Sequence, residues 1–153
     1  MKTNLIVLGG GESGVGAAYL ANKNGMNVFL SDINIIETSY KKILIDNGIE
    51  FEEGKHSLNK ILKANEIIKS PGIPNDCDLV LKILKNNIPI VSEIEFAGYF
   101  CDKKTICITG SNGKTTTTLL IHHILKKAGI KVGLAGNVGT SLARQLVENL
   151  HDY

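Results

Sequence analysis

The chain has 153 residues, of which 43% are hydrophobic and 21% are charged, and its formal net charge is +2. These values are typical of a globular protein with a buried core and exclude a disordered chain. The balance of 17 basic and 15 acidic residues argues against a nucleic-acid-binding surface. Neither a secretory signal nor a run of roughly 20 apolar residues is present, so we expect a cytoplasmic protein without membrane insertion.

Short apolar runs alternate with segments of helical period over residues 1–92. The run "NLIVL" at 4–8 is continuously apolar, which is typical of a strand covered on both faces. Strands are expected at 4–8, 27–32, 49–54, 65–70 and 88–92, and helices at 14–25, 39–48 and 78–87. This alternation with short links predicts a parallel, doubly wound, Rossmann-like sheet.

A second unit is expected over residues 93–153. Its predicted elements are a helix at 93–100, a strand at 104–110, a helix at 114–129, a strand at 130–135, a loop at 136–139 and a helix at 140–150. Two strands are fewer than a covered parallel sheet normally has. We therefore expect this unit to be the truncated start of a longer domain.

The first glycine cluster follows the first predicted strand directly. Gly9, Gly11 and Gly14 have the spacing Gly-x-Gly-x-x-Gly, and Asp32 ends the second predicted strand. Glycines at this junction allow main-chain amides and a helix N-terminus to hold a diphosphate, and the acid is placed to meet a ribose. NAD, FAD or a UDP-sugar would all suit this pattern. The structural alternative is a tight turn that binds nothing, with Asp32 solvated.

The second cluster is "TGSNGKTT" at 109–116, between a predicted strand and a predicted helix. In a phosphate-binding loop, backbone amides cradle the phosphates, a lysine meets their charge and a hydroxyl binds Mg²⁺. Lys114 and Thr115 suit the last two roles, although Ile108 stands where the common form of the loop has its first glycine. The structural alternative is a capped helix start with an exposed lysine. Thr117 and Thr118 are expected to be packing or surface residues.

The string Thr-Gly-x-Asn-Gly-Lys-Thr-Thr resembles the ATP site of the Mur ligase and folylpolyglutamate synthetase superfamily. The strings "GGGESG" (9–14), "SD" (31–32), "SPGIP" (70–74), "SEIEF" (92–96) and "GNVG" (136–139) extend the resemblance to Mur ligases over the whole chain. Among them, "SPGIP" points to the branch of the family that adds D-glutamate.

The resemblance implies an α/β protein with a Rossmann-like UDP-substrate-binding domain at 1–92, followed at 93–153 by the N-terminal part of a P-loop-type ATP-binding domain. It implies an ATP-dependent acid–D-amino-acid ligase of peptidoglycan synthesis, monomeric in its full-length form. In this reaction ATP phosphorylates the alanyl carboxylate of UDP-N-acetylmuramoyl-L-alanine, and the amine of D-glutamate attacks the acyl phosphate. No stretch matches the later acid, histidine and modified lysine of the family or its C-terminal domain, so we expect the chain alone to be inactive.

Carried onto this sequence, the resemblance assigns two sets of residues. The expected ATP-binding residues are Gly110, Ser111, Asn112, Gly113, Lys114, Thr115 and Thr116, with Lys114 as the catalytic charge on the β- and γ-phosphates and Thr115 as the Mg²⁺ ligand. The expected substrate-binding residues are Gly11, Glu12, Ser13, Gly14, Asp32, Ile33, Ser70, Gly72 and Asn137. Ile33 replaces a polar residue common in the family, so its contact is expected through the backbone.

Three other interpretations stay open from the sequence. A dinucleotide-binding module would use NAD or FAD on the first cluster and would leave the second cluster unexplained. Another ligase of the same family would add a different amino acid, whose pocket is expected outside this chain. An isolated, non-enzymatic fragment could pair with a second copy.

Overall fold

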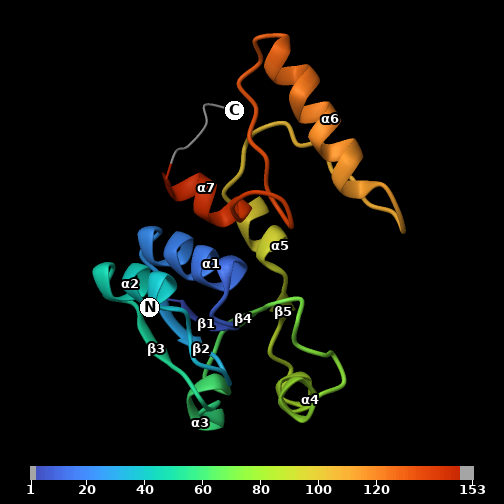
Figure 1. The fold of residues 1–153 in the computed structure, drawn as a ribbon. Helices are drawn as coiled ribbons and strands as arrows, with labels where there is room; N and C mark the ends of the chain where they lie inside the picture. Colours follow the sequence, from blue (N-terminus) through green and yellow to red (C-terminus); the bar gives the residue numbers. More distant parts are fainter. Residues whose placement is uncertain (1–2, 149–153) are drawn as a thin grey trace.

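The computed structural model describes residues 3–148 and contains a five-stranded sheet in the order β3-β2-β1-β4-β5 (Figure 1). All neighbouring strands are parallel. The strands are β1 Asn4–Leu8, β2 Asn27–Ser31, β3 Glu50–Glu52, β4 Glu66–Lys69 and β5 Ile90–Val91. The predicted parallel, doubly wound sheet is therefore confirmed. Its strand order reverses between β1 and β4, and such a switch point is where open α/β sheets bind ligands.

Seven helices connect and cover the strands in the described part of the chain. They are α1 Glu12–Lys23, α2 Thr38–Asp46, α3 Leu58–Ile61, α4 Asp78–Lys85, α5 Glu93–Gly98, α6 Lys114–Lys127 and α7 Leu142–Glu148. Each predicted helix is present with small shifts of its ends, and the single turn α3 was not predicted. Residues 149 and 150 of the last predicted helix lie outside the described residues.

The apolar run of β1 is divided between the two faces of the sheet. Leu5 and Val7 belong to a buried cluster with α1, α2, α5 and α7, whereas Ile6 and Leu8 belong to a cluster with α3 and α4. Successive side chains of a strand point to opposite faces, so a continuous apolar run serves a sheet covered on both sides. The three layers can be followed in Figure 1, with α1 and α2 on one side of the sheet and α3 and α4 on the other.

The two strands predicted at 104–110 and 130–135 are wrong for this structure. Residues 104–110 have no regular secondary structure, and the second segment contributes only an isolated bridge between Ala135 and Thr140. A strand needs a neighbour for its backbone N–H and C=O groups, and the described chain offers none to these segments. Ile106 and Ile130, expected inside strands, are exposed.

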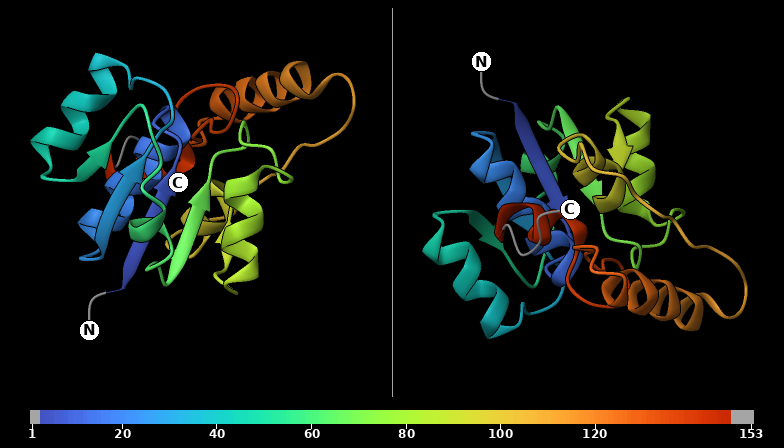
Figure 2. Two further views of the ribbon diagram at one scale, coloured as in Figure 1. Left: turned by 90° about the horizontal axis from the view of Figure 1, so that it is seen from below. Right: turned by 90° about the horizontal axis from the view of Figure 1, so that it is seen from above.

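Helix α6 and helix α7 differ in how they contact the sheet. No residue of α6 is buried, and the helix stands away from the sheet in each view (Figures 1 and 2). In contrast, Phe96 and Ala97 of α5 and Ala143 of α7 lie in the same buried cluster as β1 and α1. Residues beyond 92 thus complete the core on the α1 face. Within residues 3–148, no helix combines the length and the apolar character needed to cross a membrane.

Candidate functional site

The first glycine cluster forms a closed loop between β1 and α1. The amide of Gly9, which has a φ of +105°, donates to the carbonyl of Ser31 over 2.9 Å. A Cβ at Gly14 would overlap the carbonyl oxygen of Gly9, and a Cβ at Gly9 would overlap the hydroxyl of Ser70. Glycine is therefore required at position 14 by close backbone approach, and at position 9 by the positive φ and the neighbouring Ser70 side chain. Gly9 thus lies in close contact with two predicted site positions, Gly14 and Ser70.

Asp32 joins this loop to the turn after β2. Its two carboxylate oxygens accept hydrogen bonds from the amide of Gly10 at 2.5 Å and from the amide of Asn34 at 2.8 Å. Each carboxylate oxygen can accept more than one hydrogen bond, so the group retains acceptor capacity for a ligand hydroxyl. Ile33 lies in the same turn with 56% of its surface exposed. The structure thus places Asp32, with Ile33 next to it in the turn, beside the glycine loop.

Gly11 differs from Gly9 and Gly14 because its surroundings leave room for a side chain. A Cβ at Gly11 would meet no atom within 4 Å, and the residue is the N-cap of α1 with a φ of −85°. A Cβ at Gly72 would likewise meet no atom within 4 Å. Open space in front of a helix N-terminus suits a phosphate, which needs close access to main-chain amides.

A pocket of about 540 Å³ lies at the carboxyl ends of the strands on the β4 and β5 side of β1. It brings together Ser13 at the start of α1 and Asn137 in the loop before α7, two predicted substrate-binding residues far apart in the sequence. Its remaining lining residues are Lys69, Pro71, Asn75, Val80, Leu84, Ile90, Val91, Ser92, Glu93, Ile94, Gly136 and Ser141. The other predicted substrate residues do not line it.

Lys69 and Glu93 are pocket residues that the sequence analysis did not identify. The ammonium of Lys69 donates to the carbonyls of Ile73 at 2.6 Å and Ser70 at 3.3 Å, and so holds the loop that contains "SPGIP". It pairs with no carboxylate within the described residues. Lys69 is the last residue of β4, and Glu93 lies two residues after the end of β5. This position at strand ends was the available signal, since ligand-binding groups of such sheets gather there.

Glu93 is a buried carboxylate with 5% of its surface exposed. It accepts a hydrogen bond from the amide of Ala143 at 2.7 Å. Burial raises the pKa of Glu93 above its usual value; the hydrogen bond from Ala143 opposes this shift, and the nearby Glu12 carboxylate reinforces it. Ser92, just before it, forms a capping box with Glu95 at the start of α5, a pattern of residue types visible in "SEIE".

A partly buried polar network supports the turn after β2 from the β3 side. The hydroxyl of Ser31 donates to Glu52 at 2.8 Å and lies 2.7 Å from Nδ1 of His56. Ser57 donates to Glu52 from its amide at 2.6 Å and from its hydroxyl at 2.5 Å. Burial alone would raise the pKa of Glu52, but the hydrogen bonds from Ser57 and Ser31 outweigh it and lower the pKa. The network fixes the chain directly before Asp32.

The second glycine cluster lies at a helix start, as predicted. Gly110 and Gly113 have positive φ angles of +146° and +77°, and Gly113 is the N-cap of α6, which begins at Lys114. The ammonium of Lys114 folds back over the loop and donates to the carbonyls of Gly110 and Ser111. Among the described residues, the amides of 111–113 make no hydrogen bond. Free amides, a helix N-terminus and a lysine at one exposed loop fit the phosphates of ATP.

Thr115 and Thr116 lie exposed in the first turn of α6, whereas Thr118 donates its hydroxyl to the carbonyl of Lys114 at 2.8 Å. The hydroxyl of Thr118 therefore donates its hydrogen to the helix backbone. A hydroxyl such as that of Thr115 can supply one oxygen ligand to Mg²⁺. Within residues 3–148 no cluster of three or more His, Cys, Asp or Glu side chains could hold a metal ion.

Comparison with known proteins identifies both parts of the chain. Residues 4–79 match the MurD N-terminal domain, and residues 108–152 match the Mur ligase middle domain. The chain belongs to the Mur ligase family. Its two glycine loops fall in the two matched domains, one in each.

Curated Mur ligases resemble the chain over nearly its whole length. It is 58% identical over 149 residues, or 97% of the chain, to a UDP-N-acetylmuramoylalanine–D-glutamate ligase of Bacteroides fragilis. It is 54% identical over 153 residues, or 100% of the chain, to the enzyme of the same name from Porphyromonas gingivalis. The chain spans 34% of the length of each of these relatives.

Solved Mur ligase structures share the fold. A pseudomurein peptide ligase type C from Methanothermus fervidus is 32% identical with a TM-score of 0.58, covering 90% of this chain and 29% of its own. A UDP-N-acetylmuramate–alanine ligase from Thermotoga maritima is 26% identical with a TM-score of 0.55, covering 86% of this chain and 30% of its own. Their similarity extends over both units of this Mur ligase chain.

Proposed function

We propose that this chain forms the substrate-binding part and the nucleotide loop of an ATP-dependent ligase that adds D-glutamate to UDP-N-acetylmuramoyl-L-alanine. The observation that carries the proposal is the meeting of Ser13 and Asn137 in one pocket at the switch point of the sheet. The names of the relatives support the same substrate and amino acid. Since ATP is consumed, we place the reaction in the cytoplasm.

In this proposal the glycine loop and the turn after β2 hold the UDP group. The open space at Gly11 admits the diphosphate to the amides of residues 11–13 at the N-terminus of α1. Asp32, already fixed by Gly10 and Asn34, accepts hydrogen bonds from the uridine, with the backbone of Ile33 beside it. The sugar and its alanyl arm then enter the pocket between Ser13 and Asn137. Lys69 adds a positive charge to the wall of a pocket that takes an anionic ligand.

The loop 110–116 has a separate role, since it does not line that pocket. Its amides cradle the phosphates of ATP, and Lys114 stabilises the charge that develops on the transferred phosphoryl group. Thr115 supplies one oxygen to Mg²⁺, which neutralises phosphate charge when it is bound. We assign residues 1–92 to the UDP-substrate domain and residues 93–153 to the start of the ATP-binding domain. The full-length enzyme is proposed to be a monomer.

The reaction joins UDP-N-acetylmuramoyl-L-alanine to D-glutamate in two steps. The alanyl carboxylate takes the γ-phosphoryl group of ATP, which releases ADP, and the amine of D-glutamate then displaces phosphate to form the amide. The residues of this chain bind and orient the reactants: Asn137 lies at the reacting end of the sugar nucleotide, and Lys114 lies at the phosphoryl group. Positioning of this kind is the main contribution of proteins to phosphoryl transfer.

Titration calorimetry tests the substrate assignment. We expect the chain to bind UDP-N-acetylmuramoyl-L-alanine and to bind NADH at least about tenfold more weakly, a difference of roughly 1.4 kcal/mol. Preference for NADH would support the dinucleotide-binding alternative and defeat the proposal. Comparing ligands that carry L-alanine with ligands that lack it then separates the D-glutamate branch from a ligase that acts on a different acceptor.

A further inference from the structure

The start of α7 is held by carboxylates from two other helices. The first amides of a helix lack partners within it and need other acceptors. At α7, the amide of Ser141 donates to Glu12 of α1 at 3.0 Å, and the amide of Ala143 donates to Glu93 of α5 at 2.7 Å. Ser141 and Glu93 are both buried. The backbone at this point is therefore fixed by groups far away in the sequence.

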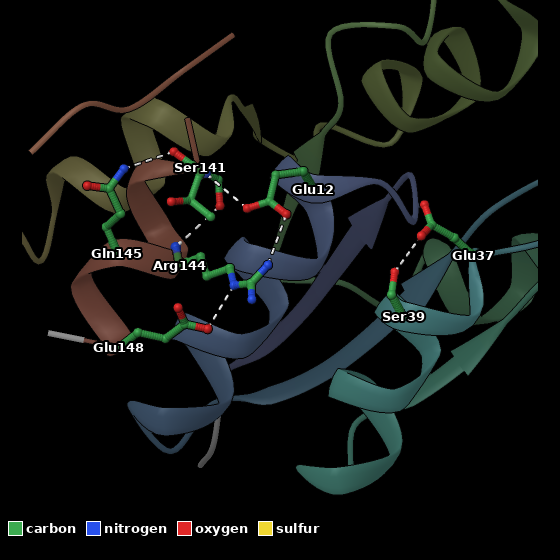
Figure 3. A network of polar contacts seen from close by, with 8 residues as sticks. Glu12, Glu37, Ser39, Ser141, Arg144, Gln145 and Glu148 are labelled. Atoms are coloured by element: carbon green, nitrogen blue, oxygen red, sulfur yellow. Dashed lines mark hydrogen bonds and ion pairs between the residues drawn. The ribbon is translucent and has the colours of Figure 1, made fainter. Parts of the chain in front are cut away.

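Glu12 makes a second contact, which also joins α1 to α7. Its other carboxylate oxygen lies 3.2 Å from Nη1 of Arg144, whose Nε donates to Glu148 at 2.7 Å. Figure 3 shows Ser141, directly before α7, and Arg144 of α7 facing Glu12. A Cβ at Gly16, one turn further along α1, would overlap the hydroxyl of Ser141, so the two helices approach as closely as glycine permits. The contact between α1 and the α7 region therefore combines a hydrogen bond, an ion pair and close packing.

The loop that carries Asn137 is attached to α7. The side-chain amide of Gln145 donates to the carbonyls of Leu134 at 2.7 Å and Thr140 at 2.9 Å, which closes residues 134–140 on the helix. A Cβ at Gly139, whose φ is +87°, would lie 2.5 Å from the carbonyl oxygen of Leu134. Movement of α7 relative to α1 would therefore carry Asn137 with it.

Glu12 is also the residue between Gly11 and Ser13 in the proposed diphosphate loop. Its backbone belongs to that loop, while both oxygens of its side chain hold α7. We propose that Glu12 and Arg144 are positioning residues that set the distance between the diphosphate loop and Asn137, with Glu93 as a second support. This inference rests on the proposed function. Its consequence is that the interface governs recognition of the muramoyl part of the ligand more than recognition of UDP.

The experiment compares two ligands, UDP and UDP-N-acetylmuramoyl-L-alanine, by calorimetry on the 153-residue chain. In Arg144→Gln we expect the affinity for the larger ligand to fall about fivefold or more relative to that for UDP, the size of an ordinary coupling between sites. Glu12→Gln should lower the ratio of the two affinities in the same direction. Glu148→Gln is the matched control, since Glu148 pairs with the same guanidinium but contacts neither loop; its ratio should equal that of the unmodified chain.

An equal loss of affinity for both ligands, or no change of the ratio in Arg144→Gln and Glu12→Gln, would overturn the positioning role. Amide hydrogen exchange of residues 134–145 supplies a readout that needs no ligand. Exchange there should be faster in Arg144→Gln than in Glu148→Gln, while exchange in β1 and β2 should stay unchanged. Equal exchange in the two variants would contradict the inference. If the unmodified chain binds neither ligand, the proposed function fails and the ligand-positioning role fails with it, while the exchange measurement still shows whether Arg144 holds residues 134–145 in place.

Discussion

The carboxylate of Asp32 accepts a hydrogen bond from the amide of Gly10 at 2.5 Å. The acid that follows β2 therefore closes the glycine loop that follows β1. The two residues follow the neighbouring parallel strands β1 and β2, whose ends meet at the same edge of the sheet. The second oxygen of Asp32 holds the amide of Asn34. Asp32 thus shapes the proposed UDP site in addition to facing it.

Substitution of Asp32 is expected to affect both binding and stability. In Asp32→Ala, binding of UDP-N-acetylmuramoyl-L-alanine should be lost in calorimetry, and the unfolding free energy should fall by about 1–3 kcal/mol because two amides lose a charged acceptor. Asp46→Ala is the control, an exposed acid at the end of α2. Unchanged affinity in Asp32→Ala would contradict the assignment to the uridine.

Two glycines of the same loop should respond differently to alanine. Gly11→Ala should leave the urea midpoint unchanged, since its Cβ meets no atom within 4 Å, yet weaken binding of UDP by obstructing the amides. Gly14→Ala should lower the unfolding free energy by about 2 kcal/mol or more, because its Cβ would overlap the carbonyl oxygen of Gly9. Equal UDP affinity in Gly11→Ala and the unmodified chain would argue against a diphosphate at this position.

Glu93 should make the protein less stable as pH rises. Its folded pKa is raised, so the folded state binds the proton more tightly than the unfolded state, whose pKa is near 4.5. The stabilising effect of protonation is complete below that value and is lost as pH rises through the folded pKa. Urea unfolding from pH 4 to pH 7 should therefore show that Glu93→Gln gains stability relative to the unmodified chain as pH increases. A constant difference would show that the carboxylate does not titrate above its ordinary range.

Glu52 should show the opposite dependence on pH. Its folded pKa is lowered, so its stabilising effect is present above the ordinary value of about 4.5 and is lost as pH falls through the folded pKa. Glu52→Gln should cost about 1 kcal/mol at pH 7, and the difference should shrink on acidification. Glu50→Gln, an exposed position of the same strand, is the matched control. A difference that stays the same at pH 3 would exclude an effect of charge.

Lys114 should be needed for phosphoryl transfer and not for folding. In a protein that continues this chain to the length of its relatives, Lys114→Ala should reduce substrate-dependent phosphate release by about 10²-fold or more, since a positioned charge at the phosphates is lost. Thermal unfolding should be unchanged, because the residue is exposed. Lys126→Ala, in the last turn of the same helix, is the control for charge. Near-normal turnover in Lys114→Ala would defeat its proposed role.

Local patterns predicted much of the fold. The apolar run of β1, the glycines after it and the helical periods of α1 and α4 each depend on neighbours within a few residues, and all are present where expected. The single turn α3 was missed because four residues carry no measurable period. The predicted strand at 104–110 is absent because its pattern describes a segment that can pair, whereas pairing requires a partner strand.

The sequence by itself determined the two glycine loops, the alternation of strands and helices over residues 1–92, and the family resemblance, because backbone freedom, capping and apolar period are local properties. Only the tertiary structure decided that Glu12 holds Ser141 and Arg144, that Glu93 is buried against Ala143, and that Ser13 and Asn137 share a pocket. These contacts join residues from distant segments, and their geometry arises when α1, α5 and α7 pack on one sheet face. No residue type or spacing in the chain specifies such pairs before the helices meet.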